Sequence, residues 1–538
     1  MKKRKKIILG SITGALALAL AGGGFWAYKT FVPQETPIDK NATVASNFYQ
    51  AVNKDWLLKT KIPADSPSID NFYTLDEDIK GKLKKDIKNL GEGKETSDIT
   101  GMSEFITFYK AASDYKQREK DGLEPLKPYL KEIEDIKDVN DLASKSASLT
   151  DKGIPLPFGY DVGTNAENTS QKQIQLSPPS ILLPDVSIYK DEASKKQYLT
   201  PIETATQKAL EMLGYSEKNS KRIVKEALEF DEIIAKYSLS NEEMSESKNL
   251  VHPKTAEEIN AYSGSFKLYD VIKGIMGRDL ETINVPNTKY FENYSKIVNQ
   301  DNFSKIKSWI LVQEAMAASN SLTEDYRLNF QSISMAIMGT QKPVSKEDTV
   351  YEMSVHLFSD VMSVYYGRKY FGEEAKTDVT GMIDKIKNVY RGRLQQNDWL
   401  TEDTRNKAIE KLDKMKVFVG YQEDVDPGTK ELHLDPNKSF FELSEDIAQF
   451  GKRYTIDHFD DPIDKNKWSG SAFDINAYYN PESNSINFPA GILQAPFYDK
   501  NQSVEKNYGG IGVVIGHEIT HAFDSNGADY DENGDMHN

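Results

Sequence analysis

The chain has 538 residues, of which 38% are hydrophobic, so it can bury a large core but is too long for one compact domain. Its formal net charge of -16 argues against nucleic acid as a partner, because no excess positive charge would offset phosphate repulsion. Cysteine is absent, which excludes disulfides, thiolate nucleophiles and Cys-ligated zinc. Any metal ion must therefore be held by His, Asp or Glu.

The N-terminus has the pattern of a targeting element. Residues 2–6 are all Lys or Arg, and residues 7–28 form an uncharged, mostly apolar run long enough to cross about 30 Å of hydrocarbon as a helix. The positive-inside rule predicts that residues 1–6 stay in the cytoplasm and that 7–28 form a single-pass anchor in the cell membrane. The rest of the chain, after a linker at 29–45, would then be extracellular. A signal sequence cleaved after Ala21, which would release a secreted protein, is the competing interpretation.

Most of the chain after the linker has the pattern of helices. Apolar residues recur at three- and four-residue spacings up to about residue 415, as in SKIKSWILVQEAMAASN (304–320). A Pro-, Ser- and Gln-rich segment at 153–186 predicts short strands and loops. Strand signals return in three short segments, KVFVGY (416–421), SAFDINAYYN (471–480) and NSINFPAG (484–491). The sequence therefore predicts a mostly α (α+β) fold with a large helical lobe.

The clearest chemical signal is HEITH at 517–521, an H-E-x-x-H motif. On a helix, the four-residue spacing places His517 and His521 on one face about 6 Å apart, so that both imidazoles can reach one zinc ion. Glu518 projects about 100° around the helix from His517, where it can hold a zinc-bound water without ligating the metal. It is then placed to accept a proton as this water attacks a peptide carbonyl, and to return the proton to the leaving amine.

Two neighbouring features support the motif. Asp524 lies three residues after His521 on the same side, where it is predicted to accept the other ring N–H of His521 and fix its tautomer. The opposite side of the predicted helix is an apolar stripe that would bury it, formed by Val514, Ile515, Ile519, Ala522 and Phe523. An ordinary amphipathic helix with two chance histidines is the alternative interpretation.

The sequence shows no clear third zinc ligand, although catalytic zinc usually has three protein ligands. His537 lies far along the chain from His521, and the compact motif H-E-x-x-H-x-x-G-x-x-H would need histidine where Gly527 stands. Glu532 is closer but lies in DYDENGD (529–535), a polar stretch rich in turn residues. His537 and Glu532 both stay open as loop ligands, while a missing third ligand is favoured. The same stretch imitates the start of an EF-hand loop, so calcium binding is an alternative to an acidic surface turn.

Five ordered segments carry a family resemblance. They are NFYQAVNKDWLLKTKIPAD (47–65), FYKAASD (108–114), NDWLTEDTRNKAIEKLDKMKVFVGY (397–421), INAYYNPESNSINFPAGILQAPFYD (475–499) and GGIGVVIGHEITHAFD (509–524). In this order they resemble the neprilysin and endothelin-converting-enzyme family of zinc metallopeptidases, including its bacterial oligopeptide-cleaving members. Together they are far more specific than the H-E-x-x-H motif alone.

The resemblance implies a role for each residue of the motif. His517 and His521 correspond to zinc ligands, Glu518 to the catalytic base, and Asp524 to the carboxylate behind His521. One Zn²⁺ per chain is therefore expected. The family's third ligand is a glutamate in an E-x-x-x-D motif, which is expected beyond residue 538. The chain is accordingly interpreted as truncated at its C-terminus and inactive by itself.

The resemblance also implies an architecture and a way of binding substrate. Asn476 and Ala477 match a pair that hydrogen-bonds the backbone of an extended peptide as an added strand. A helical cap lobe at 76–410 is expected to be inserted in a thermolysin-like (gluzincin) catalytic lobe built from 46–75 and 411–538. The two lobes would enclose the active site in a chamber that admits short peptides and excludes folded proteins.

The predicted function is that of a membrane-anchored zinc endopeptidase that hydrolyses oligopeptides outside the cell. Its partners would be oligopeptide substrates and the membrane. A catalytically inactive, membrane-tethered protein that binds peptides or acts as a scaffold is one alternative, but the intact HEITH residues argue against it. A calcium-dependent adhesion or sensor module built on the acidic stretch at 529–535 is another.

Overall fold

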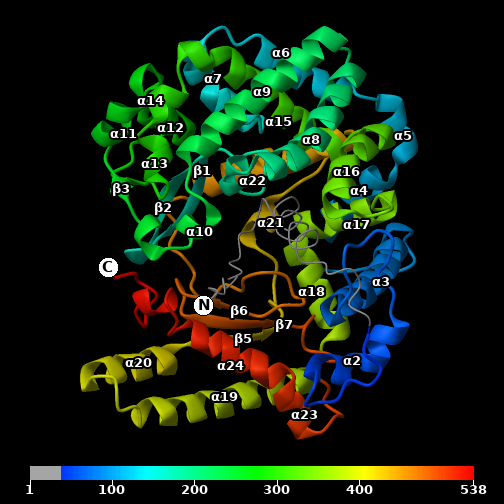
Figure 1. The fold of residues 1–538 in the computed structure, drawn as a ribbon, viewed down its shortest axis with the longest axis vertical. Helices are drawn as coiled ribbons and strands as arrows, with labels where there is room; N and C mark the ends of the chain where they lie inside the picture. Colours follow the sequence, from blue (N-terminus) through cyan, green and yellow to red (C-terminus); the bar gives the residue numbers. More distant parts are fainter. Residues whose placement is uncertain (1–37, 538) are drawn as a thin grey trace.

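The computed structural model describes residues 38–537 and shows a mostly helical molecule with two small sheets (Figure 1). One sheet and most of the helices fill the upper part of the view, and the second sheet lies in the lower part, above α24 and α19. The predicted mostly helical class with a minor β component is confirmed.

The predicted location at the cell membrane is corrected by the structure. Among the helices of residues 38–537, none has both the length and the apolar character needed to cross a bilayer. The proposed anchor at 7–28 and the cytoplasmic segment at 1–6 lie outside the described residues. Most of the described helices contribute buried apolar residues to one of three clusters, as amphipathic helices do. A single-pass membrane placement is therefore not supported.

The first helices of the described chain begin at well-formed caps. At the starts of α3, α5 and α7, the carboxylates of Asp70, Asp114 and Asp138 accept a hydrogen bond from the backbone N–H three residues on. Such capping satisfies a donor that the first turn of a helix leaves free. The helices are α2 (Phe48–Lys59), α3 (Asn71–Gly91), α4 (Met102–Ser113), α5 (Tyr115–Asp121), α6 (Lys127–Glu134) and α7 (Val139–Asp151).

The upper sheet has four strands in the order β1-β2-β4-β3. Strands β1 (Gly159–Asn165) and β2 (Asn168–Ser177) form an antiparallel hairpin inside the segment predicted to hold short strands. Two very short strands complete the sheet, β3 (Pro253–Lys254) and β4 (Ile283–Asn284). The tip of this hairpin points down toward the lower part of the molecule (Figure 1).

Around this sheet lies the helical body, by which we mean α6 to α16 with β1 to β4. Its large apolar core centres on buried residues such as Phe230 and Trp309. The buried carboxyl group of Asp231 accepts hydrogen bonds from the Leu182 N–H and the Trp309 ring N–H, each at 3.0 Å, so its oxygens do not lack partners. The remaining helices of the helical body are α8 (Glu192–Met212), α9 (Glu217–Tyr237), α10 (Asn241–Met244), α11 (Ala256–Tyr262), α12 (Leu268–Met276), α13 (Thr288–Phe291), α14 (Tyr294–Ile297), α15 (Phe303–Ala317) and α16 (Glu324–Met338).

The lower sheet has the order β5-β7-β6. Strand β7 (Ser485–Pro489) is fully buried and pairs parallel with β5 (Lys416–Gly420) and antiparallel with β6 (Tyr478–Asn480). The predicted strand at 471–480 is thus regular only over its last three residues. The helices that follow the helical body are α17 (Lys346–Leu357), α18 (Ser359–Tyr370), α19 (Glu373–Gln395), α20 (Glu402–Lys414), α21 (Pro427–Glu431), α22 (Phe440–Asp457), α23 (Val504–Gly509) and α24 (Ile511–His521).

Two further apolar clusters build the rest of the molecule. One joins α3 and α4 to α17 and α18, and the other packs α19, β5 and β7 against α24. Helix α22 links the helical body to the cluster around α3 and α4. Phe441 belongs to the core of the helical body, and Phe440 belongs to that cluster. The lower sheet and α19 therefore fix the position of α24, which carries the HEITH residues.

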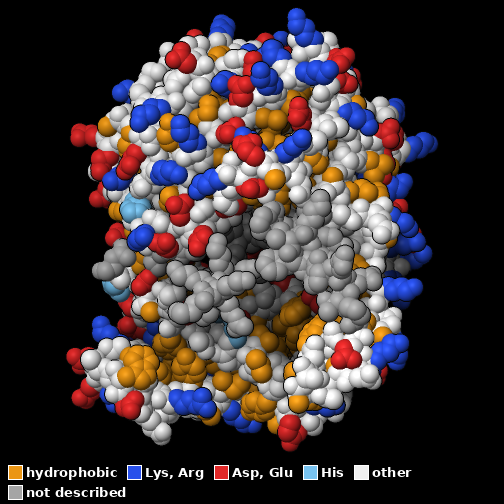
Figure 2. All heavy atoms as spheres, in the orientation of Figure 1, with side chains coloured by type: hydrophobic (Ala, Val, Ile, Leu, Met, Phe, Trp, Pro, Cys, Tyr) orange, Lys and Arg blue, Asp and Glu red, His pale blue; other side chains and the backbone are white. Residues whose placement is uncertain are grey.

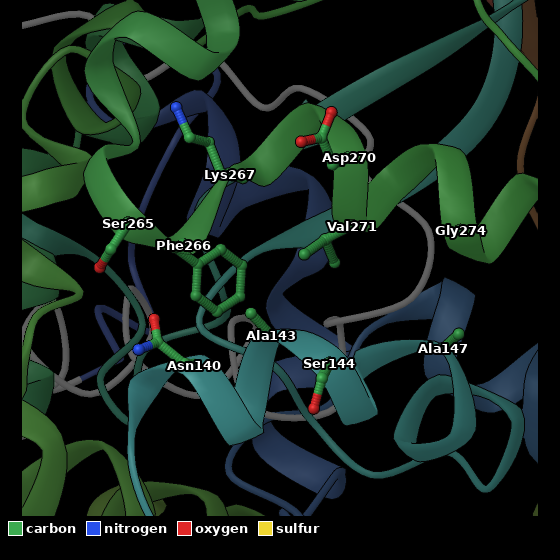
Figure 3. Close-up of a pocket in the computed structure, with 10 residues that line it drawn as sticks. All are labelled: Asn140, Ala143, Ser144, Ala147, Ser265, Phe266, Lys267, Asp270, Val271 and Gly274. Carbon is green, nitrogen blue, oxygen red and sulfur yellow. The ribbon is translucent and has the colours of Figure 1, made fainter.

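The outer surface of the helical body holds a groove of about 370 Å³ between α7 and the start of α12 (Figure 3). Phe266 points into it, and Lys267 and Asp270 are the charged residues that line it. One lysine and one aspartate cannot supply a set of metal ligands. The groove also includes none of the predicted site residues, so the candidate site must be elsewhere.

Large exposed hydrophobic side chains are unevenly distributed over the described chain. They occur at residues 44–72 and again at 344–513, and none occurs at 73–343. Among them, Val389, Trp399 and Val513 belong to α19, the α19–α20 loop and α24, and Figure 2 shows hydrophobic side chains gathered over this lower part. The helical body thus has the surface of a self-contained unit, whereas the part around α24 keeps apolar surface exposed.

Candidate metal centre

Helix α24 places the HEITH residues by burying its opposite side. Ile515, Ile519 and Ala522 of the predicted apolar stripe are completely buried, and Val514 and Phe523 are partly buried against the same cluster. The helix packs on α19 and on β6. His517, half a turn away from this stripe, is therefore left exposed, and His521 is partly exposed.

The rings of His517 and His521 converge. The Nε2 atoms of His517 and His521 are 3.0 Å apart, and their rings meet edge to face with centroids 4.5 Å apart. A zinc ion binds imidazole nitrogen at about 2.0–2.1 Å, so two nitrogens at this separation can share one ion. Ligand atoms of His517, Glu518 and His521 all lie within 4.8 Å of one another. No other trio of His, Asp or Glu side chains in residues 38–537 meets this criterion.

Asp524 holds the second ring nitrogen of His521. The His521 Nδ1–H donates to Asp524 Oδ2 at 2.7 Å, which leaves the lone pair of Nε2 free for a metal. The other carboxylate oxygen, Oδ1, accepts the backbone N–H groups of Asn526 (3.0 Å) and Gly527 (2.8 Å). Burial alone would raise the pKa of the Asp524 carboxyl, but these donors and the His521 ring hold the pKa below its usual value. The carboxylate is therefore a stable acceptor.

Glu518 points away from solvent, toward the lower sheet. Its side chain is only 5% exposed, and burial raises the pKa of the carboxyl to about 7. The nearby His521 ring and the backbone N–H of Tyr479 act in the opposite direction. A carboxyl group with a pKa near 7 can both accept and release a proton at neutral pH, as a general base must.

Asn476 and Ala477 lie immediately before β6, next to α24. Asn476 is exposed and Ala477 is buried. Strand β6 pairs with β7 on one side, and within residues 38–537 no strand pairs with its other side. The structure thus packs β6 and its open edge against α24, the helix that carries the two histidines.

A polar cavity of about 630 Å³ continues from the end of β6. Asn480 and Glu482 line it on the side of the lower sheet, and Thr164 and Thr169 line it from the tip of the β1–β2 hairpin. Asp360 at the start of α18 closes another side. Residues from the helical body and from the lower sheet thus share one cavity.

The two loop residues left open as a third ligand are engaged elsewhere. His537 Nε2 lies 3.0 Å from Asp531 Oδ2, and Glu532 pairs with the Lys414 ammonium at 3.1 Å. The Oδ1 atom of Asp531 accepts the backbone N–H groups of Asn533 and Asp535, so the acidic stretch is a hydrogen-bonded turn. These contacts place neither His537 nor Glu532 with the two histidines.

Two contributors to this site carry no sequence motif. Gly527 packs so closely on the end of α24 that an added Cβ would lie 1.8 Å from the His521 carbonyl oxygen. Lys411, on α20, donates to the carbonyl oxygens of Gly527 and Tyr530. Only the tertiary structure shows that Lys411 reaches this turn, because α20 and the turn are far apart in the sequence.

Comparison with known proteins agrees with this geometry. Two models described as peptidase family M13 match residues 44–422 and 476–538. A neutral endopeptidase of Lactobacillus helveticus is 36% identical over 501 residues, which cover 93% of this chain and 77% of that protein. The crystal structure of PepO from Lactobacillus rhamnosis HN001 matches with a TM-score of 0.88 and 27% identity over 92% of this chain and 79% of that one. The Mycobacterium tuberculosis zinc metalloprotease Zmp1, at 23% identity and a TM-score of 0.83, covers 94% of this chain and 76% of its own, and shares the fold.

Proposed function

This chain belongs to peptidase family M13, the zinc metalloendopeptidases, and on that premise we propose that α24 supplies its catalytic centre. His517 and His521 would hold the zinc ion, and Asp524 would orient His521. The observation that carries this proposal is the pair of Nε2 atoms 3.0 Å apart, with the buried Glu518 carboxyl beside them. Bound zinc supplies a Lewis acid that lowers the pKa of a water molecule to about 7.

Glu518 is the proposed general base. Its carboxyl accepts the proton of the attacking water and passes this proton to the leaving amine of the cleaved peptide. The pKa near 7 that burial gives this carboxyl suits both steps. Burial beside β6 also keeps the carboxyl next to the strand edge where we place the peptide.

The proposed substrates are oligopeptides bound in extended form. The open edge of β6 can accept a peptide as an added strand, with Asn476 and Ala477 hydrogen-bonding its backbone. The cavity that continues from the end of β6 is lined mostly by polar side chains, which suits a peptide chain more than an apolar small molecule. A cavity walled by both the hairpin tip and the lower sheet would exclude a folded protein.

The direct test is zinc binding by the 538-residue chain. Residues 38–537 bring together two imidazole ligands, one fewer than catalytic zinc usually has, so we expect one weakly bound ion with a dissociation constant above about 1 μM. Isothermal titration calorimetry measures this constant. His521→Ala should abolish binding, while His356→Ala, which changes an exposed histidine, should not. Nanomolar binding would contradict the two-ligand set, and no binding at all would contradict the site. For the same reason we expect the chain to be inactive by itself.

The substrate proposal is tested in a fused chain, in which residues 1–538 are followed by the C-terminal residues of the Lactobacillus helveticus neutral endopeptidase. Asn476→Ala should raise KM for an oligopeptide by about 3–10-fold with little change in kcat, because one hydrogen bond to the substrate is lost. Asn219→Ala, at an exposed position on α9, is the matched control. An unchanged KM would remove Asn476 from the binding edge.

A further inference from the structure

Lys411 is an unusual residue on α20. Most of this helix is exposed, yet Lys411 is only 5% exposed, and Leu412 is the only other buried residue on the helix. An ammonium group is costly to bury unless its donors are satisfied. Its contacts therefore indicate what the residue does.

The Lys411 ammonium binds the turn that follows α24. Its Nζ donates to the carbonyl oxygens of Gly527 at 2.5 Å and Tyr530 at 2.6 Å. It also lies 5.9 Å from the centre of the Tyr479 ring on β6, within the range of a cation–π contact. A single side chain thus ties α20 to both the turn and the strand next to the candidate metal centre.

The turn held by Lys411 is the same turn that holds Asp524. Gly527 donates its N–H to Asp524 Oδ1 while its carbonyl accepts from Lys411. Asp524 Oδ2 in turn accepts the His521 Nδ1–H at 2.7 Å. A continuous chain of hydrogen bonds therefore runs from Lys411 through Gly527 and Asp524 to His521.

We propose that Lys411 is a positioning residue, which fixes the turn at 524–530 so that Asp524 stays aligned with His521. This inference rests on the proposed function, because it gives His521 the role of a zinc ligand. Removing a group that helps to orient a metal-ligating histidine typically weakens metal affinity by about 10–100-fold. Burial lowers the pKa of the Lys411 ammonium to about 8, whereas nearby carboxylates such as Asp531 raise this pKa. The group therefore still carries its proton at neutral pH.

The test is a double-mutant cycle on the zinc affinity of the 538-residue chain. Lys411→Met keeps an unbranched apolar side chain, one atom shorter than that of lysine, but removes the donors, and should weaken zinc binding by about 10-fold. In an Asp524→Ala background, the same change should alter affinity by less than about twofold, because the link through which Lys411 acts is gone. Lys407→Met, one turn earlier on α20 and exposed, is the matched control and should have no effect.

Each outcome of the cycle decides the proposal. If Lys411→Met weakens zinc binding equally with and without Asp524, Lys411 has only a general structural role and the proposal is overturned. The proposal is also overturned if Lys411→Met binds zinc as tightly as Lys407→Met. Circular dichroism confirms folding before each titration. If Lys411→Met does not fold, Lys411→Gln, which keeps one N–H donor group, takes its place with an expected loss of about threefold.

A second measurement needs no metal. Hydrogen exchange by mass spectrometry should show the amides of residues 522–530 exchanging about 10-fold faster in zinc-free Lys411→Met than in the unchanged chain or in Lys407→Met. Unchanged exchange would overturn the proposal even if zinc binds. If the unchanged chain binds no zinc, the proposed function fails, and this exchange experiment still decides whether Lys411 holds the turn.

Discussion

Replacing Glu518 with glutamine in the fused chain is expected to lower kcat by about 10²–10⁴-fold while zinc stays bound. Glutamine has almost the same size and can still accept the Tyr479 N–H through its amide oxygen, so the buried pocket beside β6 should persist. It cannot accept a proton from water, and the base is thereby removed. The measurement is kcat and KM for a fluorogenic oligopeptide, together with the zinc content of the same sample.

The matched control for this substitution is Glu505→Gln. Glu505 is exposed on α23, a short distance before α24, so the change removes one carboxylate of the same type without touching the site. Activity above about a tenth of the unchanged value in Glu518→Gln would show that another group acts as base. Loss of zinc along with activity would contradict the assignment of Glu518 as a residue that does not ligate the metal.

The second large effect concerns stability and is expected at Glu314. Glu314→Gln should make the chain more stable than the unchanged protein at pH 8.5, by about 2–4 kcal/mol, and should change little near pH 4.5. Glu314 lies on α15 and is only 5% exposed. Burial raises the pKa of its carboxyl to about 8, the negative Glu445 on α22 adds to this effect, and Lys452 opposes it.

The direction of this pH dependence follows from which state of the chain holds the proton of Glu314. Between about pH 4.5 and pH 8, the folded chain keeps a proton on Glu314 that the unfolded chain has already released. Rising pH therefore favours the unfolded chain across this window, and above it the folded chain carries a buried charge. Glutamine has no proton to lose, so the variant lacks this part of the pH dependence.

Thermal unfolding midpoints measured from pH 4.5 to 8.5 test this prediction. The gain from Glu314→Gln should grow steadily with pH, whereas Glu203→Gln, at an exposed position on α8, should give a constant difference. Parallel curves for Glu314→Gln and the unchanged chain would show that folding does not raise the pKa of Glu314, and would contradict the prediction. Glu445 has its own pKa raised to about 7 by burial, so some pH dependence will remain in the variant.

Several features of the fold and site followed from short-range rules. The apolar stripe of 514–523 predicts which side of α24 is buried, because residues three and four apart share one helix face. The same rule brings His517 and His521 together and puts Asp524 behind His521. The mostly helical class and the strands near 416–420 and 485–489 could also be predicted from periodicity and turn residues.

Other features depend on contacts between distant segments. The burial of Glu518 needs β6, and the turn that holds Asp524 needs Lys411 from α20, yet no local pattern marks either contact. Helix α22 joins two cores because its two adjacent phenylalanines pack into different apolar clusters, which periodicity did not reveal. The membrane placement is corrected, because no helix within residues 38–537 is long and apolar enough to cross a bilayer.

The spacing of HEITHAFD alone was enough to predict two metal ligands, a base and an orienting carboxylate, because a helix has a fixed local geometry. The proton affinity of Glu518, the alignment of Asp524 and the open strand edge beside them were decided only in the tertiary structure. Each depends on burial or on hydrogen bonds between groups far apart in the chain, and such contacts form only when α20, the lower sheet and α24 pack together.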